Sequence, residues 1–567
     1  MSLRHVLGGG LTALVMLAAP AGTSSAQNAG EMSPQQFTRA DTLRGMLRPE
    51  RTSYDVRWYG LDVRVDPATR RVAGSNTIRF TAVERSQVMQ VDLFRAMEIR
   101  SAVLDGADSL RYLREFNAVF FQLPRPLQPG TTHELVIRYD GEPKVAKNPP
   151  WDGGLIWTKD STGNPWVAVA CEGTGASLWW PCKDHWADKP DSVQIGVTVP
   201  PGLEDVSNGR LRTVTTLPDG WRKYVWAVTY PINNYDVTIN VGKFAHFSDT
   251  YTGDETLTLD YYVLPGDLTK ARRQFEQVKS MLGCFEKDFG PYPFARDGYK
   301  LVQSPHLGME HQSAVAYGNG FRNGYHGTAS SSWGLKFDFI IIHESAHEWW
   351  GNSVTAKDPA DMWIHEGFGA HAEAMYVECM FGTKAMLEYV NAKKNQVMNR
   401  RPVIGTYNVN NEGSGDMYPK GSLMLNTLRG VLDNDSLWHA LIRGIAATYR
   451  YRTITTDTIV AYVNRHTGTD YTYFFDQYLR SPSIPRLEVV LLARRDSLRC
   501  RYRWHADVKD FRMPVRVTTA PGKLAFIHPT TEWQTAELGG MDPKDFRVDE
   551  DWFYIDTQIR IVYLASE

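Results

Sequence analysis

The sequence is poor in cysteine, with only five in 567 residues: Cys171, Cys182, Cys284, Cys379 and Cys500. None of them forms a Cys-x-x-Cys pair, so the sequence does not predict a structural zinc ribbon. An odd and sparse set is not a disulfide scaffold either. Cys171 and Cys182 are the only close pair, and the sequence leaves open whether they are bonded.

An excess of charge and long hydrophobic runs are also lacking. The formal net charge is -2, and 22% of the residues are charged. Proteins that bind nucleic acid usually carry a basic patch or have a high pI, so nucleic acid is not an expected partner. After residue 26 no stretch has eighteen uninterrupted apolar residues. We therefore expect a soluble mature protein without stable membrane insertion.

Residues 1–26 have the pattern of a secretory signal peptide. Arg4 and His5 give a short basic start, residues 6–21 are apolar or small, and residues 24–26 (Ser-Ser-Ala) offer a cleavage site. The alternative is a membrane anchor, which needs about 20 apolar residues and does not suit this short, glycine-rich run. We therefore expect export to the periplasm or the extracellular space.

The chain is too long for one hydrophobic core, and its patterning divides it into parts. Residues 27–50 are polar and predict a linker. Alternation of apolar and polar residues, as in the segment Leu-Asp-Val-Arg-Val at 61–65, predicts an antiparallel β domain over 51–264. Helical patterning dominates 265–482, and alternation returns over 483–567, where we expect a small β-sandwich. The predicted fold class is multidomain α+β, with a mainly α domain between two β domains.

The patterning also predicts where individual helices lie. A helix with Asp267 as its N-cap is expected to stop at Gly290. Further helices are expected over residues 335–350, 363–380, 419–432, 435–449 and 456–466.

Two histidines in the second of these helices have the spacing of metal ligands. His343 and His347 are four residues apart and therefore stand on one helix face. Two imidazoles so placed can share one zinc ion at Zn–N distances of about 2.0–2.1 Å, and Glu344 between them is placed to hold a zinc-bound water. A catalytic zinc needs a third protein ligand. Glu366, with eighteen residues between it and His347, is our candidate. The alternative is a hydrogen-bonded histidine pair in the core.

A zinc site of this kind indicates amide hydrolysis. Zinc lowers the pKa of its bound water to about 7, and Glu344 can take the proton and pass it to the leaving amine. The oxyanion that forms needs a hydrogen-bond donor besides the metal. Tyr418, at a predicted junction between loop and helix, is the candidate donor. Taken alone, a tyrosine before a proline is more often a packed turn residue.

The segments HESAHEWWGN (343–352) and WIHEGF (363–368) resemble the zinc aminopeptidase family of aminopeptidase N and leukotriene hydrolase. The resemblance covers roughly residues 54–480. It implies a thermolysin-like catalytic domain that holds one Zn²⁺ per chain. The family has a Tyr-x-Lys-Gly element whose tyrosine stabilises the tetrahedral intermediate, and the resemblance implies that role for Tyr418.

The resemblance also implies a substrate site. The family's Gly-x-Met-Glu-Asn strand, which binds the substrate's free N-terminus, corresponds here to Gly308, Met309 and Glu310, although Leu307 and His311 replace its first Gly and its Asn. A second carboxylate that contacts the substrate amine stands ten residues before Cys182 and is therefore Glu172. Two neighbouring carboxylates repel each other unless a cation joins them, and an ammonium group resolves that conflict. The expected partners are therefore peptides with a free N-terminus. Without the resemblance, Glu310 and Glu172 read as solvated loop residues.

The helix predicted over residues 363–380 contains two further polar residues near Glu366, namely Glu373 and His365. Glu373 could accept a hydrogen bond from a zinc-bound histidine, or lie on a solvated helix face. His365 replaces an asparagine of the family, and the sequence predicts no role for it.

The favoured interpretation is a secreted zinc aminopeptidase. A zinc endopeptidase is the first alternative, because the amine-binding strand is altered. A catalytically inactive binding or scaffold protein on the same fold is the second, and an epoxide hydrolase of the leukotriene type is a third. Many relatives end in a long helical domain, whereas about 80 residues of β pattern follow the catalytic part here, so a more open cleft is expected.

Overall fold

The computed structural model describes residues 36–495 and 497–564, and the chain from Arg39 onward forms one unit. The predicted signal peptide and the first part of the predicted linker lie outside the described residues. The rest of that linker contains two short helices, α1 (Arg39–Gly45) and α2 (Pro49–Thr52).

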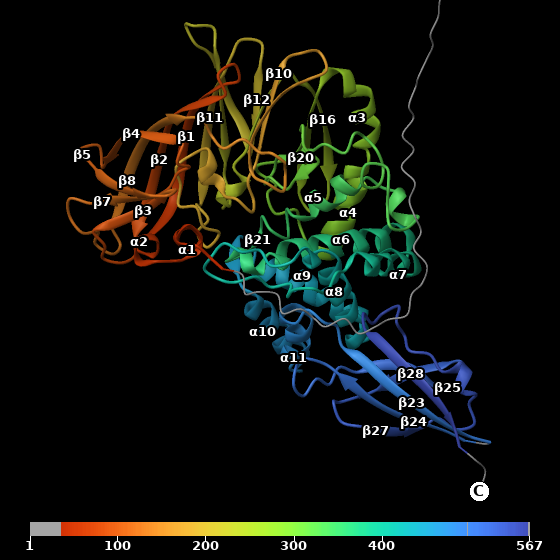
Figure 1. Cartoon of the computed structure of the whole chain (residues 1–567). Coiled ribbons are helices and arrows are strands. Elements are labelled where there is room, and N and C mark those ends of the chain that lie inside the picture. The colour runs from red at the N-terminus through yellow and green to blue at the C-terminus, as the bar shows by residue number, and fades with distance from the viewer. Residues whose placement is uncertain (1–35, 496, 565–567) are drawn as a thin grey trace, which may run out of the picture. The chain divides into compact units, whose positions relative to one another are not determined.

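An eight-stranded sheet forms the first layer of the β-rich part (Figure 1). Its long central strands are β1 (Tyr54–Asp66), β2 (Arg71–Ala82), β8 (Thr132–Gly141) and β11 (Ser192–Val199). The outer strands are β13 (Arg210–Thr216) and β14 (Arg222–Val228) on one side and β4 (Met97–Leu104) and β5 (Asp108–Ser109) on the other. The order is β13-β14-β11-β1-β2-β8-β4-β5. Leu61, Val63 and Val65 are buried as their alternation predicts. The sheet is not wholly antiparallel, however, because β1 pairs with β11 in parallel register.

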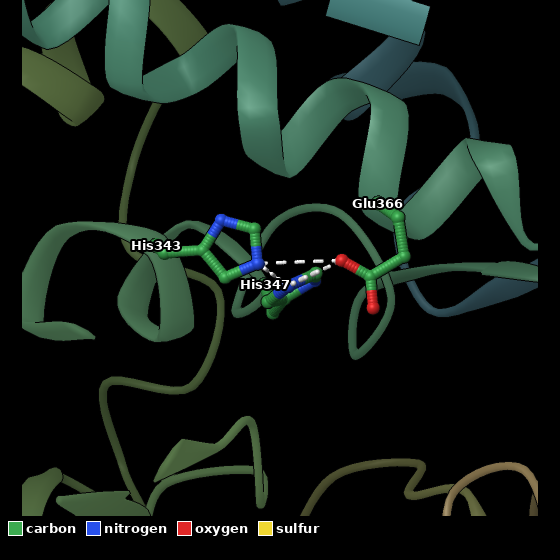
Figure 2. A group of neighbouring side chains, drawn as sticks. All are labelled: His343, His347 and Glu366. Atoms are coloured by element: carbon green, nitrogen blue, oxygen red, sulfur yellow. Dashed lines mark hydrogen bonds and ion pairs between the residues drawn. The ribbon is translucent and has the colours of Figure 1, made fainter. Parts of the chain in front are cut away.

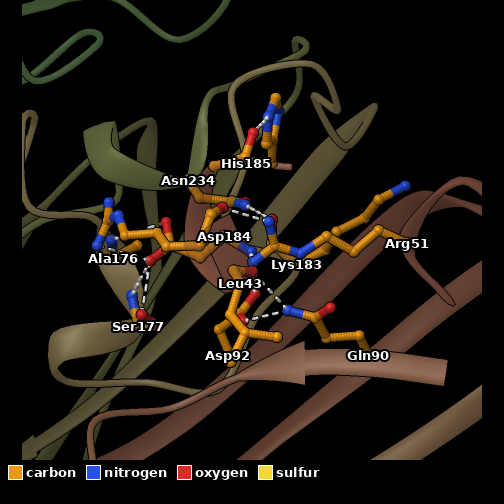
Figure 3. Close-up of polar contacts among 12 residues, drawn as sticks. Leu43, Arg51, Gln90, Asp92, Ala176, Ser177, Lys183, Asp184, His185 and Asn234 are labelled. Atoms are coloured by element: carbon orange, nitrogen blue, oxygen red, sulfur yellow. Dashed lines mark hydrogen bonds and ion pairs between the residues drawn. The ribbon is translucent and has the colours of Figure 1, made fainter. Parts of the chain in front are cut away.

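Figure 3 shows how α1 and α2 are bound to this β-rich part by buried polar groups. Arg51 pairs with Asp92 at 2.5 Å, and the side chain of Gln90 donates to the carbonyl of Leu43. His185 accepts from the backbone N–H of Ala187 at Nδ1, so its Nε2–H donates to the carbonyl of Gly45. The segment before β1 is therefore an ordered part of the fold rather than a loose linker.

Two smaller sheets lead toward the centre of the chain. The first has the order β12-β15-β10-β9 and consists of β12 (Glu204–Ser207), β15 (Ile239–Gly242), β10 (Pro165–Ala170) and β9 (Gly154–Lys159). Strand β10 ends two residues before Glu172. The second has the order β16-β17-β18-β20-β19 and consists of β16 (Ala245–Thr252), β17 (Thr256–Val263), β18 (Tyr299–Gln303), β20 (Val315–Tyr317) and the edge strand β19 (Gly308–Met309). One side of β19 is paired with β20, so its other side is available to an extended chain.

The helical part follows (Figure 1). Its main helices are α4 (Gln277–Phe289), α5 (Phe339–Ala346), α6 (Trp363–Phe381), α8 (Pro419–Leu432), α9 (Asp435–Thr448) and α10 (Thr456–Thr467). Helix α6 packs against both α5 and α8. All but the last four residues of α6 are buried, which explains why its sequence is apolar on every side.

Two of the predicted helices differ in the structure. The helix predicted over 335–350 begins only at Phe339, because the carboxylate of Asp338 caps it by accepting from the N–H groups of Ile340 and Ile341, and it ends at Ala346 with His347 as C-cap. The helix predicted after Asp267 is split into α3 (Leu268–Gln274) and α4.

Asp267 stands at the N-cap position of α3, as predicted, but its carboxylate makes no capping hydrogen bond. Its carboxylate instead accepts hydrogen bonds from the side chains of Lys270 and Gln303. A further helix, α7 (Thr383–Ala392), was not predicted.

One disulfide, Cys284–Cys379, joins α4 to α6. Cys171, Cys182 and Cys500 are buried free thiols, which answers the question that the sequence left open.

The last part of the chain is β-rich, as predicted. A four-stranded sheet has the order β27-β24-β23-β28, formed by β23 (Arg486–Arg494), β24 (Ser497–His505), β27 (Gln534–Glu537) and β28 (Asp556–Tyr563). A separate two-stranded sheet is formed by β25 (Val515–Ala520) and β26 (Lys523–Ile527). The predicted class, a mainly α part between two β parts, is confirmed. Within the described residues, none of the helices has the length and apolar character that a membrane span requires.

Candidate metal centre and substrate cleft

Three side chains from two helices converge on one point (Figure 2). His343 lies in the last turn of α5, His347 caps that helix, and Glu366 lies in the first turn of α6. The Nε2 atoms of the two histidines are 3.3 Å apart, and Glu366 Oε2 lies 3.3 Å from the first and 3.5 Å from the second. All three side chains are buried.

The other nitrogen of each histidine ring is occupied by a hydrogen bond. His343 Nδ1–H donates to Glu373 Oε1 at 2.7 Å, and His347 Nδ1–H donates to the carbonyl of Trp350 at 2.8 Å. Both tautomers therefore direct a lone pair on Nε2 toward the common point. The predicted contact of Glu373 with a histidine of the triad is confirmed.

A buried lysine, Lys393, helps to keep Glu373 ionised. Lys393 Nζ lies 2.6 Å from Glu373 Oε2. Burial opposes ionisation of Glu373, but the charge of Lys393 and the hydrogen bond from His343 together outweigh it and lower the pKa of Glu373 to about 2. Glu373 is therefore an anion that strengthens His343 as a ligand.

The triad fits a zinc ion. Ligands at about 2.0–2.1 Å in tetrahedral geometry stand roughly 3.3–3.4 Å from one another, which is close to the three separations above. Glu366 Oε2 is buried and accepts no hydrogen bond from any described residue, which is costly for a carboxylate unless a cation binds it. Two imidazoles and one carboxylate leave a fourth position open, as in catalytic zinc sites.

Glu344 faces the same cavity from α5. A Cβ atom at Gly308 would lie 2.5 Å from Glu344 Oε1, so only glycine lets the edge strand β19 run this close to the carboxylate. Burial raises the pKa of Glu344 to about 7. A carboxylate with such a pKa can both take and return a proton near neutral pH.

Tyr418 approaches the triad from the start of α8. Its hydroxyl donates to Glu366 Oε1 at 2.8 Å, and burial together with the charge of Glu366 keeps its pKa well above the usual value. The phenol is therefore a proton donor beside the metal position. Helix α8 comes this close to α6 because two glycines meet: a Cβ atom at Gly421 would lie 2.8 Å from the Cα of Gly367.

The two carboxylates predicted to bind an amine lie together. Oxygens of Glu172 and Glu310 and a nitrogen of His365 are all within 4.8 Å of one another. Tyr235 donates to Glu310 Oε1 at 3.1 Å, and the side chain of Asn352 donates to the backbone carbonyl of Glu310. Burial, and then the charge of Glu310, raises the pKa of Glu172 well above its usual value, and burial also raises that of Glu310. A cation between them would relieve this repulsion.

These groups line one cavity of about 850 Å³. Its lining includes the predicted residues Glu172, Gly308, Met309, Glu310, His343, Glu344, Glu366 and Tyr418. Leu307 also lines the cavity, whereas His311 is fully buried.

Several contacts of the site were missing from the sequence-based prediction. Tyr235 and Lys393 are distant in sequence from the residues that they bind, and no local pattern marks them. The contact of His365 with Glu172 also went unpredicted, although the replacement of the family's asparagine there was visible.

Comparison with known proteins shows which family this part of the sequence resembles. Residues 273–478 match the Peptidase family M1 domain. This part of the chain is an M1 peptidase domain. The family resemblance predicted from the motifs is thereby confirmed, and with it the expectation of a zinc cofactor, which the triad of the M1 domain fits.

The relatives of this chain extend the match into the β-rich part. Endoplasmic reticulum aminopeptidase 1 of Rattus norvegicus is 22% identical over 409 residues, which cover 68% of this chain and 43% of the relative. Leukotriene A-4 hydrolase of Xenopus laevis is 21% identical over 453 residues, which cover 75% of this chain and 69% of the relative. The chain thus spans less than half the length of the first curated relatives that it matches, at 43%, 35% and 34%.

A solved structure shows the same fold. The M1 zinc metallopeptidase from Deinococcus radiodurans superposes with a TM-score of 0.64 at 23% sequence identity, over 76% of this chain and 94% of that chain.

Proposed function

We propose that this protein is a zinc aminopeptidase that removes N-terminal residues from peptides. The observation that carries the proposal is the pair Glu172 and Glu310, whose oxygens lie close together in the cavity that His343 and Glu366 also line. A partly buried and a buried carboxylate, both with raised pKa values, form a receptor for a substrate ammonium group. An endopeptidase would have no use for such a receptor, because its substrates present no charge there.

Each side chain of the site has its own role in the proposed reaction. Zinc, when bound, polarises the scissile carbonyl and lowers the pKa of a bound water. Glu344 takes a proton from the attacking water and returns it to the leaving amine. Tyr418 donates a hydrogen bond to the oxyanion that develops on the substrate. Glu172 and Glu310 hold the ammonium group, and the free side of β19 supports the substrate backbone.

The test compares one fluorogenic dipeptide with its N-acetylated form on the zinc-loaded protein. We expect rapid cleavage of the free dipeptide and at least about 10-fold lower kcat/KM for the acetylated one, because a charge-assisted contact is lost. Equal rates on both substrates would establish the endopeptidase instead. No cleavage of either by protein with a full zinc complement would favour the inactive binding protein.

We also propose that residues 1–26 are removed during export. The disulfide between Cys284 and Cys379 supports this, because such bonds persist in oxidising compartments. Mass spectrometry of the protein recovered outside the cytoplasm should give an N-terminus at Gln27, and an intact N-terminus there would contradict the proposal.

A further inference from the structure

His365 is a buried histidine between the metal ligands and the amine receptor. It lies in the first turn of α6, directly before Glu366, and its side chain is fully enclosed. Its ring stacks on that of Trp186, with ring centroids 4.8 Å apart and planes 12° from parallel. The stack therefore fixes the plane of the ring.

Both ring nitrogens have a defined partner. The backbone N–H of Ala356 donates to His365 Nε2 at 2.9 Å, so Nε2 is an acceptor and carries no proton. The proton of the neutral ring must then reside on Nδ1. Nδ1 lies 3.3 Å from Glu172 Oε1, and its N–H donates to that oxygen.

We propose that His365 is a positioning residue for Glu172: it holds one carboxylate oxygen so that the other faces the substrate ammonium group. The inference rests on the proposed aminopeptidase function. Glu172 follows the end of a strand in the β-rich part and lies on a loop, where a carboxylate without such a contact has several rotamers. The contact joins this loop to the helix that bears Glu366, and so sets the amine receptor at a fixed place relative to the metal.

The same tautomer decides what kind of cation the receptor accepts. The Glu172, Glu310 and His365 atoms are close enough to hold a metal ion. A metal on Nδ1 would need the lone pair of that nitrogen, yet the proton cannot move to Nε2, which faces the N–H of Ala356. The receptor therefore suits a cation that donates hydrogen bonds, as an ammonium group does, and not a second metal ion.

Two substitutions separate the contacts of His365. An asparagine places its amide close to the position of Nδ1 and can still donate to Glu172, whereas a glutamine reaches the position of Nε2 and can still accept from Ala356. We expect His365→Gln to lower kcat/KM for a free dipeptide about 10-fold or more, the usual effect of losing a hydrogen bond to a charged group. His365→Asn should stay within about 3-fold of wild type. Cleavage of the acetylated dipeptide should change in neither variant.

Zinc content and melting temperature are measured for each variant before its kinetics. If a change at position 365 disturbs the metal, Glu172→Asp breaks the same contact from the other side, since it keeps the charge but withdraws the carboxylate. It should lose as much as His365→Gln. In a Glu172→Ala background, His365→Gln should have almost no further effect, because the residue acts through Glu172.

Two results would overturn the proposal. One is that His365→Asn loses as much kcat/KM as His365→Gln, which would indicate a structural role for the contact with Ala356. The other is that Glu172→Asp retains wild-type kcat/KM, or that the effects of His365→Gln and Glu172→Ala simply add. If wild type does not distinguish free from acetylated dipeptide, the proposed function itself fails, so the two failures are distinguishable.

Discussion

Buried histidines of this protein owe their different roles to the partner of one ring nitrogen. In His343 and His347 the N–H on Nδ1 donates to protein oxygens, which leaves Nε2 free for a metal. In His365 a backbone N–H occupies Nε2, which removes that residue from the possible ligands. The chemistry of an imidazole here is thus decided by a neighbour several residues away, and the residue type alone does not reveal it.

Substitution of Glu344 tests the proton transfer. Glu344→Gln keeps the size of the side chain but cannot take a proton, so kcat should fall by roughly 10²–10⁴-fold while zinc content and melting temperature stay unchanged. Stopped assays and metal analysis on the same preparation measure both. A fall of less than 10-fold would show that another group moves the proton.

Substitution of Tyr418 tests the oxyanion donor. Tyr418→Phe removes only the hydroxyl, and we expect kcat to fall by roughly 10²–10³-fold with little change in KM. The matched control is Tyr251→Phe, because the hydroxyl of Tyr251 also donates to a glutamate, Glu286, but not in the cleft. If both variants keep wild-type kcat, Tyr418 is only a packing partner of Glu366.

At the scale of elements, α1 depends on buried polar contacts with the β-rich part (Figure 3). His185 has its Nε2–H on the carbonyl of Gly45, close to Arg51, Lys183 and Asp184. Burial, aided by the charge of Arg51, lowers the pKa of His185 to about 3, so the ring stays neutral in the folded protein.

This depressed pKa gives stability a pH dependence. An unfolded histidine titrates near 6.5, so between about pH 6.5 and 3 the unfolded chain binds the extra proton. The contribution of His185 is therefore full above pH 6.5 and is lost as the pH falls toward 3. Urea unfolding of wild type and His185→Gln at pH 8 and pH 5 measures this. From pH 8 to pH 5 the free energy of unfolding should fall more in wild type than in His185→Gln. An equal loss of unfolding free energy in the two proteins would mean that groups other than His185 cause the pH dependence.

At the scale of the whole molecule, the cleft is assembled from distant parts of the chain. Glu172 comes from the β-rich part, and Glu310 directly follows the edge strand β19. Glu366 comes from α6, and Tyr418 is the N-cap of α8. Asn410 donates to the carbonyl of Gly173 and so ties the loop of Glu172 to the helical part.

Removal of the metal should therefore destabilise the whole fold. A zinc ion that binds only the folded chain stabilises it by about 3–4 kcal/mol at a 100- to 1,000-fold excess over Kd. A chelator should lower the melting temperature, added zinc should restore it, and His343→Ala should show neither response. An unchanged melting temperature in wild type after complete removal of zinc would contradict the assignment of the triad.

The sequence was informative where function depends on spacing along one helix. The interval between His343 and His347 was readable because a helix repeats regularly. Glu366 lies on a second helix, and it was predicted from the eighteen residues that separate it from His347. The start of α5 was misplaced because Asp338 caps it, and an apolar lead-in conceals a cap. The partners Tyr235 and Lys393 could not be predicted, since their contacts depend on packing between elements that no local pattern records.

The contact between Gly367 and Gly421 limits how this active site can change over evolution. The space between α6 and α8 sets the separation of Glu366 from Tyr418, and it exists because neither helix has a side chain there. The smallest possible substitution at Gly421 adds a whole methyl group at a point where the backbones already touch. Descendants of this sequence therefore have no gradual route to a wider or narrower spacing, and they would have to alter catalysis through the surrounding loops instead.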